Sequence, residues 1–340
     1  MKYIRELPSV DELCEQYSIT ADEIKKRNIY INSIKKILSG DDSRKLIIVG
    51  PCSADRKDAV LEYTCRLREL SDKVSDRLFI VPRVYTGKPR TTGTGYKGMI
   101  HSPDASINEN LMEGVIAARD MHISVIRETG MFPADEMLYT EEICYLCDVI
   151  GYLAVGARSV EDQAHRMLAS DDTIPVGLKN PTGGSKISLI NSIKATQISH
   201  RMMYRGWEVE TKGNQYGHAI LRGFTNKSGK NHSNYHYEDI VELHDMCVKN
   251  NINNPGVIID CNHANSDKKY YEEPRIAHEV MGYCKYNPSI NHFVKGIMIE
   301  SYLEDGAQII GQGIYGKSIT DPCLGWEKSE KLIYQIADQL

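Results

Sequence analysis

LIIVG, residues 46–50, is followed by Pro51-Cys52 and is the first of eight short apolar runs along the chain. The others are LFIVP before Arg83, MFPAD before Glu136, YLAVGA before Arg158, IPVGL before Lys179, AIL before Arg222, GVIID leading to His263 and GIMI before Glu300. Runs that are apolar throughout are typical of parallel strands buried on both faces. Eight such strands predict an α/β protein with a single (β/α)8 TIM barrel. Its active site would lie where the strands end.

Composition limits the possible partners. The 340 residues carry a formal net charge of −5, which argues against nucleic acid or a membrane as partner, since both require a broad basic surface. We find no apolar run of membrane-spanning length and no signal segment. The nine cysteines follow no disulfide framework, which favours a reduced, cytoplasmic protein.

Residues 1–40 are expected to form an N-terminal helical extension, and residues 41–340 the catalytic barrel. Two capping boxes predict helix starts in the extension, Ser9 with Glu12 and Thr20 with Glu23. The isoleucines of the second helix form a stripe at positions 24, 29, 31, 34 and 37, which we expect to pack on the barrel. Gly40 can end this helix.

Three other segments carry predictions. Residues 122–128 are rich in β-branched side chains but continue a helical pattern, so we assign them to a helix and place the third strand at 131–136. Residues 199–213 are predicted to form a β-hairpin inserted before strand 6. The CxxC pair Cys144 and Cys147 lies in EEICYLCDVI, which we interpret as a helix with structural cysteines.

A metal site is predicted where the eighth strand lies beside the first. Cys52 follows the first strand, His263 the seventh, Glu300 ends the eighth and Asp321 lies in the loop beyond it. A thiolate, an imidazole and two carboxylates suit a divalent first-row transition metal better than Mg²⁺ or Ca²⁺. Cys261 is expected to point away from this site.

Cationic residues follow the strands in an unusual number. They are Arg83, Lys88, Arg90, Arg158, Lys179 and Arg222. Six cations exceed the need of one phosphate, so two phosphorylated ligands, or one phosphate and a carboxylate, are indicated. The GxGxxG match at 93–98 neither follows a strand directly nor opens a helix, which argues against a dinucleotide and favours a loop that covers the mouth.

Several motifs together resemble a known family. They are GPCS (50–53), KPRTT (88–92), GAR (156–158), PVGLKN (175–180), LRG (221–223), HANS (263–266), ES (300–301) and YGKSITD (315–321). In this order and at similar spacing they resemble the type I 3-deoxy-D-arabino-heptulosonate-7-phosphate (DAHP) synthases, over residues 3–338. The resemblance implies condensation of phosphoenolpyruvate with erythrose 4-phosphate and water to DAHP and phosphate, the first step of the shikimate pathway to chorismate and the aromatic amino acids.

The resemblance also implies site residues. The metal, Mn²⁺, Fe²⁺, Co²⁺ or Zn²⁺, would be held by Cys52, His263, Glu300 and Asp321. Phosphoenolpyruvate would be bound by Arg83, Lys88, Ala157, Arg158, Lys179 and Arg222, and erythrose 4-phosphate by Lys88, Pro89, Arg90 and Thr91. Catalysis would depend on Cys52, Lys88, Glu136, Lys179 and His263. Either Lys179 or Glu136 could transfer the proton. A homodimer or homotetramer is expected.

Two related activities stay as alternatives, a synthase that uses arabinose 5-phosphate and a metal-dependent aldolase. KPRTT favours the four-carbon sugar, and an aldolase would need only one phosphate site. The beginning of the chain and the hairpin at 199–213 are shorter than in regulated relatives. We therefore expect weak or no inhibition by aromatic amino acids.

Overall fold

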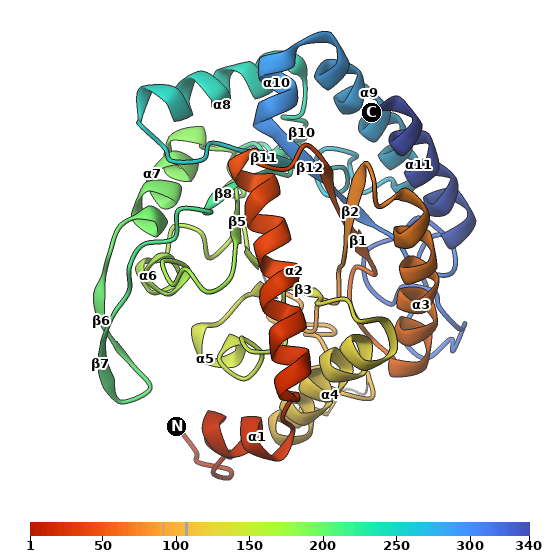
Figure 1. Ribbon diagram of the computed structural model, residues 1–340. Helices are drawn as coiled ribbons and strands as arrows, with labels where there is room; N and C mark the ends of the chain where they lie inside the picture. Colours follow the sequence, from red (N-terminus) through yellow and green to blue (C-terminus); the bar gives the residue numbers. More distant parts are fainter. Residues whose placement is uncertain (91, 106–107) are drawn as a thin grey trace.

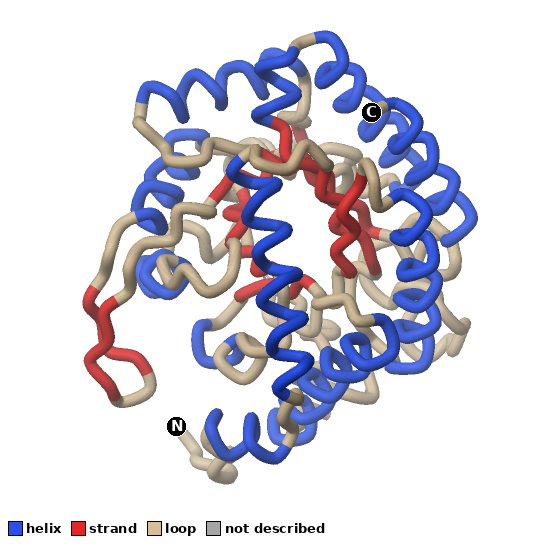
Figure 2. The backbone as a smooth tube through the Cα atoms, in the orientation of Figure 1, coloured by secondary structure: helices blue, strands red, loops and turns tan. Residues whose placement is uncertain are grey.

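The computed structural model describes residues 1–90, 92–105 and 108–340. Its centre is a parallel sheet with the strand order β2-β1-β12-β11-β8-β5-β4-β3. The bounds are β1 (Lys45–Gly50), β2 (Leu78–Pro82), β3 (Ala134–Met137), β4 (Tyr152–Val155), β5 (Val176–Lys179), β8 (His218–Leu221), β11 (Val257–Asp260) and β12 (Val294–Glu300). A parallel bridge between Arg83 and Ala134 joins β2 to β3 and closes the sheet into the predicted barrel (Figures 1 and 2).

The apolar runs form strands because both of their faces are buried. In β1, Leu46 and Ile48 face the barrel interior and belong to the same cluster as Met298 of β12. Ile47 and Val49 face outward and join the larger cluster between the sheet and the helices. Neither side of the strand meets water, so the alternation of polar and apolar residues is absent.

Helices surround the barrel (Figure 1). They are α3 (Lys57–Val74), α4 (Leu111–Thr129), α5 (Thr140–Ile143), α6 (Gln163–Ala169), α7 (Lys186–Gln197), α8 (Tyr237–Lys249), η1 (Tyr270–Glu272), α9 (Glu273–Tyr286), α10 (Pro288–Phe293) and α11 (Trp326–Gln339). Residues 122–128 lie in α4, which ends at the left-handed Gly130, so the helix prediction is confirmed. The third strand begins at Ala134, later than predicted. Pro133 precedes it and has no N–H to give to a strand ladder.

The N-terminal helices α1 (Val10–Gln16) and α2 (Ala21–Ser39) both begin at the predicted capping boxes. α2 crosses the ring of strands at their N-terminal ends (Figures 1 and 2). Ile34 and Ile37 of α2 pack in the cluster that fills the barrel interior. Ile24 and Ile29 are instead exposed, so only part of the predicted stripe packs on the barrel.

Two small hairpins interrupt the alternation of strands and helices. β6 (Arg201–Tyr204) and β7 (Trp207–Glu210) form the predicted hairpin before the sixth barrel strand. β9 (Phe224–Thr225) and β10 (Asn231–His232) form a second hairpin. The helix predicted around Cys144 and Cys147 is wrong beyond Ile143. Successive i→i−3 hydrogen bonds, such as Leu146 N to Ile143 O, make turns there instead.

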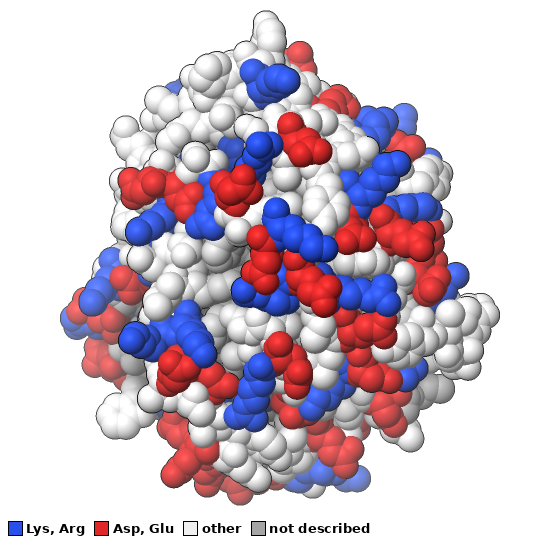
Figure 3. Space-filling view, turned by 45° about the vertical axis from the view of Figure 1, so that its right-hand side comes forward, with Lys and Arg blue, Asp and Glu red and all other residues white. Residues whose placement is uncertain are grey.

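The surface over α3 and the neighbouring helices carries interspersed charges (Figure 3). Arg66 with Glu62 and Arg68 with Asp72 form i,i+4 ion pairs on α3, which explains part of this pattern. Among the described residues, no helix is long and apolar enough to cross a membrane.

Candidate active site

A cavity of about 700 Å³ opens at the C-terminal ends of the barrel strands. All six predicted cations line it, from Arg83 beyond β2 to Arg222 beyond β8. The other predicted residues that line it are Cys52, Pro89, Glu136, Ala157, His263 and Asp321. Glu300, at the end of β12, is fully buried in the barrel end. Thr91, predicted to bind erythrose 4-phosphate, lies outside the described residues.

One corner of the cavity brings together three of the four predicted metal ligands. The ligand atoms of Cys52, Glu300 and Asp321 all lie within 4.8 Å of one another. His263 is not part of this group, but its Nε2 lies 3.8 Å from Glu300 Oε1. Sulfur, carboxylate oxygen and imidazole nitrogen form a mixed donor set that fits a divalent first-row transition metal.

The electrostatics of this corner also fit a cation. Burial raises the pKa of the Cys52 thiol to about 11, and the Glu300 carboxylate acts in the same direction. The ammonium of Lys88 lies 2.7 Å from Cys52 Sγ and 2.8 Å from Asp321 Oδ2. Burial alone would lower the pKa of Lys88, but Cys52 and Asp321 outweigh it and raise that pKa. A divalent ion among the same groups would ionise the thiol.

Glu300 is held by residues that the sequence did not single out. Its Oε1 accepts from Arg83 at 2.9 Å and its Oε2 from Asn262 Nδ2 at 2.5 Å. Its backbone N–H donates to Glu273 Oε2 at 2.9 Å. Arg83 and Asn262 therefore fix the orientation of this carboxylate, and Glu273 holds the backbone that carries it. Asn262 could have been suspected because it directly precedes His263, whereas nothing in the sequence marks Glu273.

Opposite the metal corner, Lys179 and Glu136 form a buried ion pair of 2.5 Å. Burial alone would raise the pKa of Glu136, but Lys179 and Arg83 outweigh it and lower that pKa. The guanidinium of Arg83 lies over the ring of Tyr85, with 3.8 Å between its central carbon and the centroid. Buried cations arranged in this way gain from a dianion, because few water molecules remain to solvate them.

The third region of the cavity is the loop after β2. Lys88 N donates to Lys97 O and Arg90 Nε donates to Tyr96 O, both at 2.8 Å, so the loop folds back on itself. Gly98 has a φ of 99°, and a Cβ there would lie 2.2 Å from Thr86 O. The glycines thus serve turns and close packing in a loop, as predicted, rather than a dinucleotide motif.

Further polar residues line the cavity, among them Thr182, Thr225, Asn231 and Lys268. Lys268 Nζ lies 2.9 Å from Asp321 Oδ1, so Asp321 is paired with a lysine on each side. Lys268 follows His263 by only five residues, so the sequence could have suggested that it lies at the cavity. Thr225 and Asn231 lie on β9 and β10, whose place at the mouth only the structure reveals.

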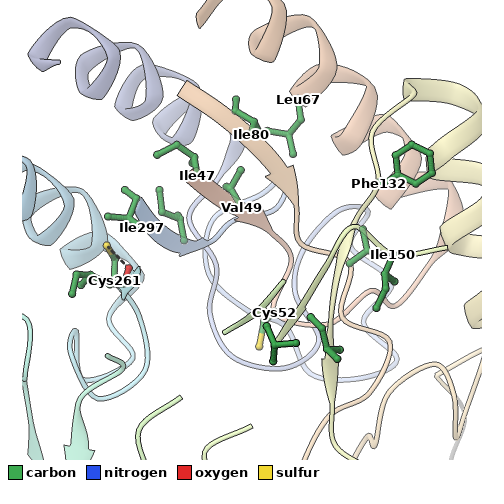
Figure 4. Packing of buried hydrophobic residues seen from close by; sticks show 14 of the residues in the cluster. Ile47, Val49, Cys52, Leu67, Ile80, Phe132, Ile150, Cys261 and Ile297 are labelled. Atoms are coloured by element: carbon green, nitrogen blue, oxygen red, sulfur yellow. Dashed lines mark hydrogen bonds between the residues drawn. The ribbon is translucent and has the colours of Figure 1, made fainter. Parts of the chain in front are cut away.

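The other cysteines mentioned above do not enter the cavity. Cys144 and Cys147 contact the backbone carbonyls of Thr140 and Ile143. Cys261 packs in the core beside β12, and Figure 4 shows it well apart from Cys52, which lies beyond the end of β1. The predicted separation of Cys261 from the metal corner is confirmed.

The chain is similar to known proteins over nearly its whole length. Residues 18–333 match the profile of the DAHP synthetase I family. The Trp-sensitive phospho-2-dehydro-3-deoxyheptonate aldolase of Escherichia coli O157:H7 is 35% identical, covering 98% of this chain and 95% of that protein. The same-named protein of Buchnera aphidicola subsp. Schizaphis graminum is 37% identical, covering 96% and 93%.

A solved structure extends the likeness to three dimensions. The phospho-2-dehydro-3-deoxyheptonate aldolase of Francisella tularensis SCHU S4 superposes with a TM-score of 0.92 at 31% identity, covering 100% of this chain and 98% of that one. The sequence profile, the relatives and the fold point the same way. The chain therefore belongs to the DAHP synthetase I family.

Proposed function

We propose that the cavity at the barrel mouth performs the family reaction with the residues described above. The chain is an enzyme that condenses phosphoenolpyruvate with erythrose 4-phosphate and water to give DAHP and phosphate, the first step of the shikimate pathway. The observation that carries the residue assignment is the convergence of six cations and a metal-ligand cluster in one cavity.

Phosphoenolpyruvate fits the buried side of the cavity. Arg83, Lys88, Arg158, Lys179 and Arg222, with the backbone at Ala157, would bind its phosphate and carboxylate. Arg83 and Lys179 are almost completely buried, so a bound anion would meet their charges with little screening by water. Lys88, Pro89, Arg90 and Thr91 would bind the phosphate of the sugar at the more open side.

The family requires a divalent metal, and Cys52, His263, Glu300 and Asp321 would hold it. Such an ion, Mn²⁺, Fe²⁺, Co²⁺ or Zn²⁺, supplies Lewis acidity that polarises the aldehyde of the sugar. The protein's own part is to fix the ligands. Arg83 and Asn262 hold Glu300 in place.

Lys179 and Glu136 would carry out the proton transfer of the reaction. Lys179 donates a hydrogen bond to Glu136, whose lowered pKa favours the carboxylate. As the donor of this hydrogen bond, Lys179 would deliver a proton to the reacting centre, while Glu136 holds its Nζ in position. Both side chains face the cavity.

We also propose that the enzyme is a homodimer or homotetramer. Met203 and Trp207 of the β6–β7 hairpin expose 92% and 75% of their surface, and Ile29 of α2 exposes 61%. Large apolar side chains with this much exposed surface are typical of subunit contacts. Size-exclusion chromatography with light scattering tests this, and a monomer at micromolar concentration would contradict it.

The reaction is tested by following the loss of phosphoenolpyruvate and the release of phosphate with either erythrose 4-phosphate or arabinose 5-phosphate. We expect turnover with the four-carbon sugar alone, its loss on chelation and its return with Mn²⁺ or Co²⁺. Full turnover of a verifiably metal-free preparation would contradict the metal site. Turnover without phosphate release would contradict the condensation.

A further inference from the structure

Asp260, the last residue of β11, is a buried carboxylate beside the metal corner. Its side chain is fully buried. Its Oδ1 accepts from Asn262 N at 3.0 Å, and its Oδ2 lies 2.8 Å from His263 Nδ1. Among the described residues, neither Oδ2 nor Nδ1 makes a hydrogen bond, so their 2.8 Å approach is an ion-pair contact between two otherwise unpartnered buried atoms. A proton on Nδ1 that points at Oδ2 would satisfy both atoms at once.

The imidazole of His263 lies between two carboxylates, one on each ring nitrogen. Nδ1 faces Asp260, and Nε2 lies 3.8 Å from Glu300 Oε1. A ring nitrogen can bind a metal only through its unprotonated lone pair. A proton held on Nδ1 by a carboxylate would leave Nε2 free to bind.

The backbone holds this arrangement in an uncommon conformation. His263 has a φ of 47°, in the left-handed region that non-glycine residues seldom occupy. Asn265 Nδ2 donates to Asp260 O, and Lys268 N donates to His263 O, both at 2.8 Å. The turn thus brings the imidazole back over the end of the strand that carries Asp260. Strained residues held by their surroundings occur frequently at functional sites.

We propose that Asp260 is a positioning residue for the metal. It holds the proton of His263 on Nδ1, fixes the ring orientation and directs Nε2 into the corner formed by Cys52, Glu300 and Asp321. This inference rests on the proposed metal site, of which His263 is a member. Removing such an outer carboxylate typically weakens metal binding 10- to 100-fold, roughly.

The experiment uses the full-length holoprotein loaded with Mn²⁺ and challenged with a chelator of known affinity. Asp260→Asn keeps the shape of the side chain but removes its charge. We expect about 10- to 100-fold weaker Mn²⁺ binding. The chain supplies a matched control in Asp162→Asn, because His165 Nδ1 lies 2.9 Å from Asp162 Oδ2 with the same i,i+3 spacing but on α6. We expect this control to bind Mn²⁺ as the wild type does.

A double-mutant cycle separates positioning from a general structural effect. If Asp260 acts through His263, Asp260→Asn changes Mn²⁺ affinity in the wild type but not in a His263→Ala background. An equal loss in both backgrounds, or no loss in either, would overturn the proposal. Unaltered affinity in His263→Ala alone would instead show that the proposed ligand set is wrong.

The Co²⁺-loaded protein gives an independent readout. Its visible absorption reports the ligands of the ion, so Asp260→Asn is expected to shift the spectrum while Asp162→Asn leaves it unchanged. Thermal unfolding of each variant after chelation shows whether the fold survives. If Asp260→Asn proves unstable, Asp260→Glu, which keeps the charge, is expected to restore part of the affinity. An affinity no better than that of Asp260→Asn would count against the proposal.

Discussion

Lys179→Met removes one partner of the buried Lys179–Glu136 ion pair and leaves a carboxylate with 6% of its surface exposed. Breaking a buried pair in this way costs about 3–5 kcal/mol of unfolding free energy, because the remaining charge is desolvated without compensation. For a chain of 340 residues the unfolding entropy is roughly 0.7 kcal/mol per kelvin. The expected fall in Tm is therefore about 4–7 °C.

Scanning calorimetry at pH 7 measures this fall, and two controls define its origin. Glu136→Gln/Lys179→Met removes both charges, so we expect it to recover most of the lost stability. Lys186→Met breaks a more exposed contact with Asp239 and Glu242 and should cost no more than about 1 °C. A double variant as unstable as Lys179→Met would refute the reasoning, as would a single variant within 1 °C of the wild type, roughly.

The pH dependence has a definite sign. Glu136 has a lowered pKa in the folded state, so its ion pair stabilises the protein above the unfolded pKa of about 4.3 and loses this effect as pH falls through the folded value. The gap in Tm between wild type and Lys179→Met should therefore narrow as the pH falls below about 4.3. A constant gap would mean that the lost stability comes from packing rather than charge.

Three further outcomes are expected. Cys52→Ala should abolish turnover and Mn²⁺ binding, whereas Cys261→Ala, which also removes a buried thiol, should lower only thermal stability; equal metal affinity in the two variants would contradict the ligand assignment. The contact with Glu142 raises the pKa of His101. This contact therefore stabilises the fold fully below the unfolded pKa of about 6.5, and its contribution is lost as pH rises through the folded pKa. The difference in Tm between wild type and His101→Gln should thus shrink as pH rises from about 6 to about 9. A difference that grows over this range would mean that the pKa of His101 is lowered rather than raised. Phenylalanine, tyrosine and tryptophan should inhibit the enzyme weakly or not at all. Two observations make this worth testing: named relatives are Trp-sensitive, and a cavity of about 540 Å³ adjoins the β6–β7 hairpin. Cooperative inhibition at submillimolar concentration in a turnover assay would disprove the prediction.

The barrel and most of the cavity lining could be predicted because each strand carries its signal locally. An unbroken apolar run such as LIIVG marks a strand, and the residue after it, such as Cys52, must emerge at the mouth. Closure of the barrel then implied that β1 and β12 are neighbours, which the pairing of Gly50 with Glu300 confirms.

Residues that act through others could not be predicted in the same way. Asp260 and Glu273 carry no signal of their own in the sequence. Asp260 meets His263, three residues further on, because the chain turns back with a left-handed φ at His263, and Glu273 meets Glu300 N because α9 lies beside β12. Tyr85 looks like a core aromatic in sequence, and only its position under Arg83 links it to the anion site. The turns after Ile143 were mistaken for helix because their apolar spacing is the same.

The bridge between Arg83 and Ala134 has a mechanical consequence. Adjacent strands elsewhere in the barrel are joined by ladders, as β1 is to β2 over five residue pairs. Among the described residues, β2 and β3 are joined instead by this bridge, by the bond from Val84 N to Ala134 O and by the bonds from Thr86 to the Asp135 carboxylate. The contact between β2 and β3 is thus where the barrel can open with the fewest broken hydrogen bonds. Arg83 stands on the β2 side of this contact, and Glu136 on the β3 side holds the ammonium of Lys179. An anion bound by both Arg83 and Lys179 would therefore link the two sides. The amide hydrogen of Val84, which donates to Ala134 O, should exchange slowly only while substrate is bound.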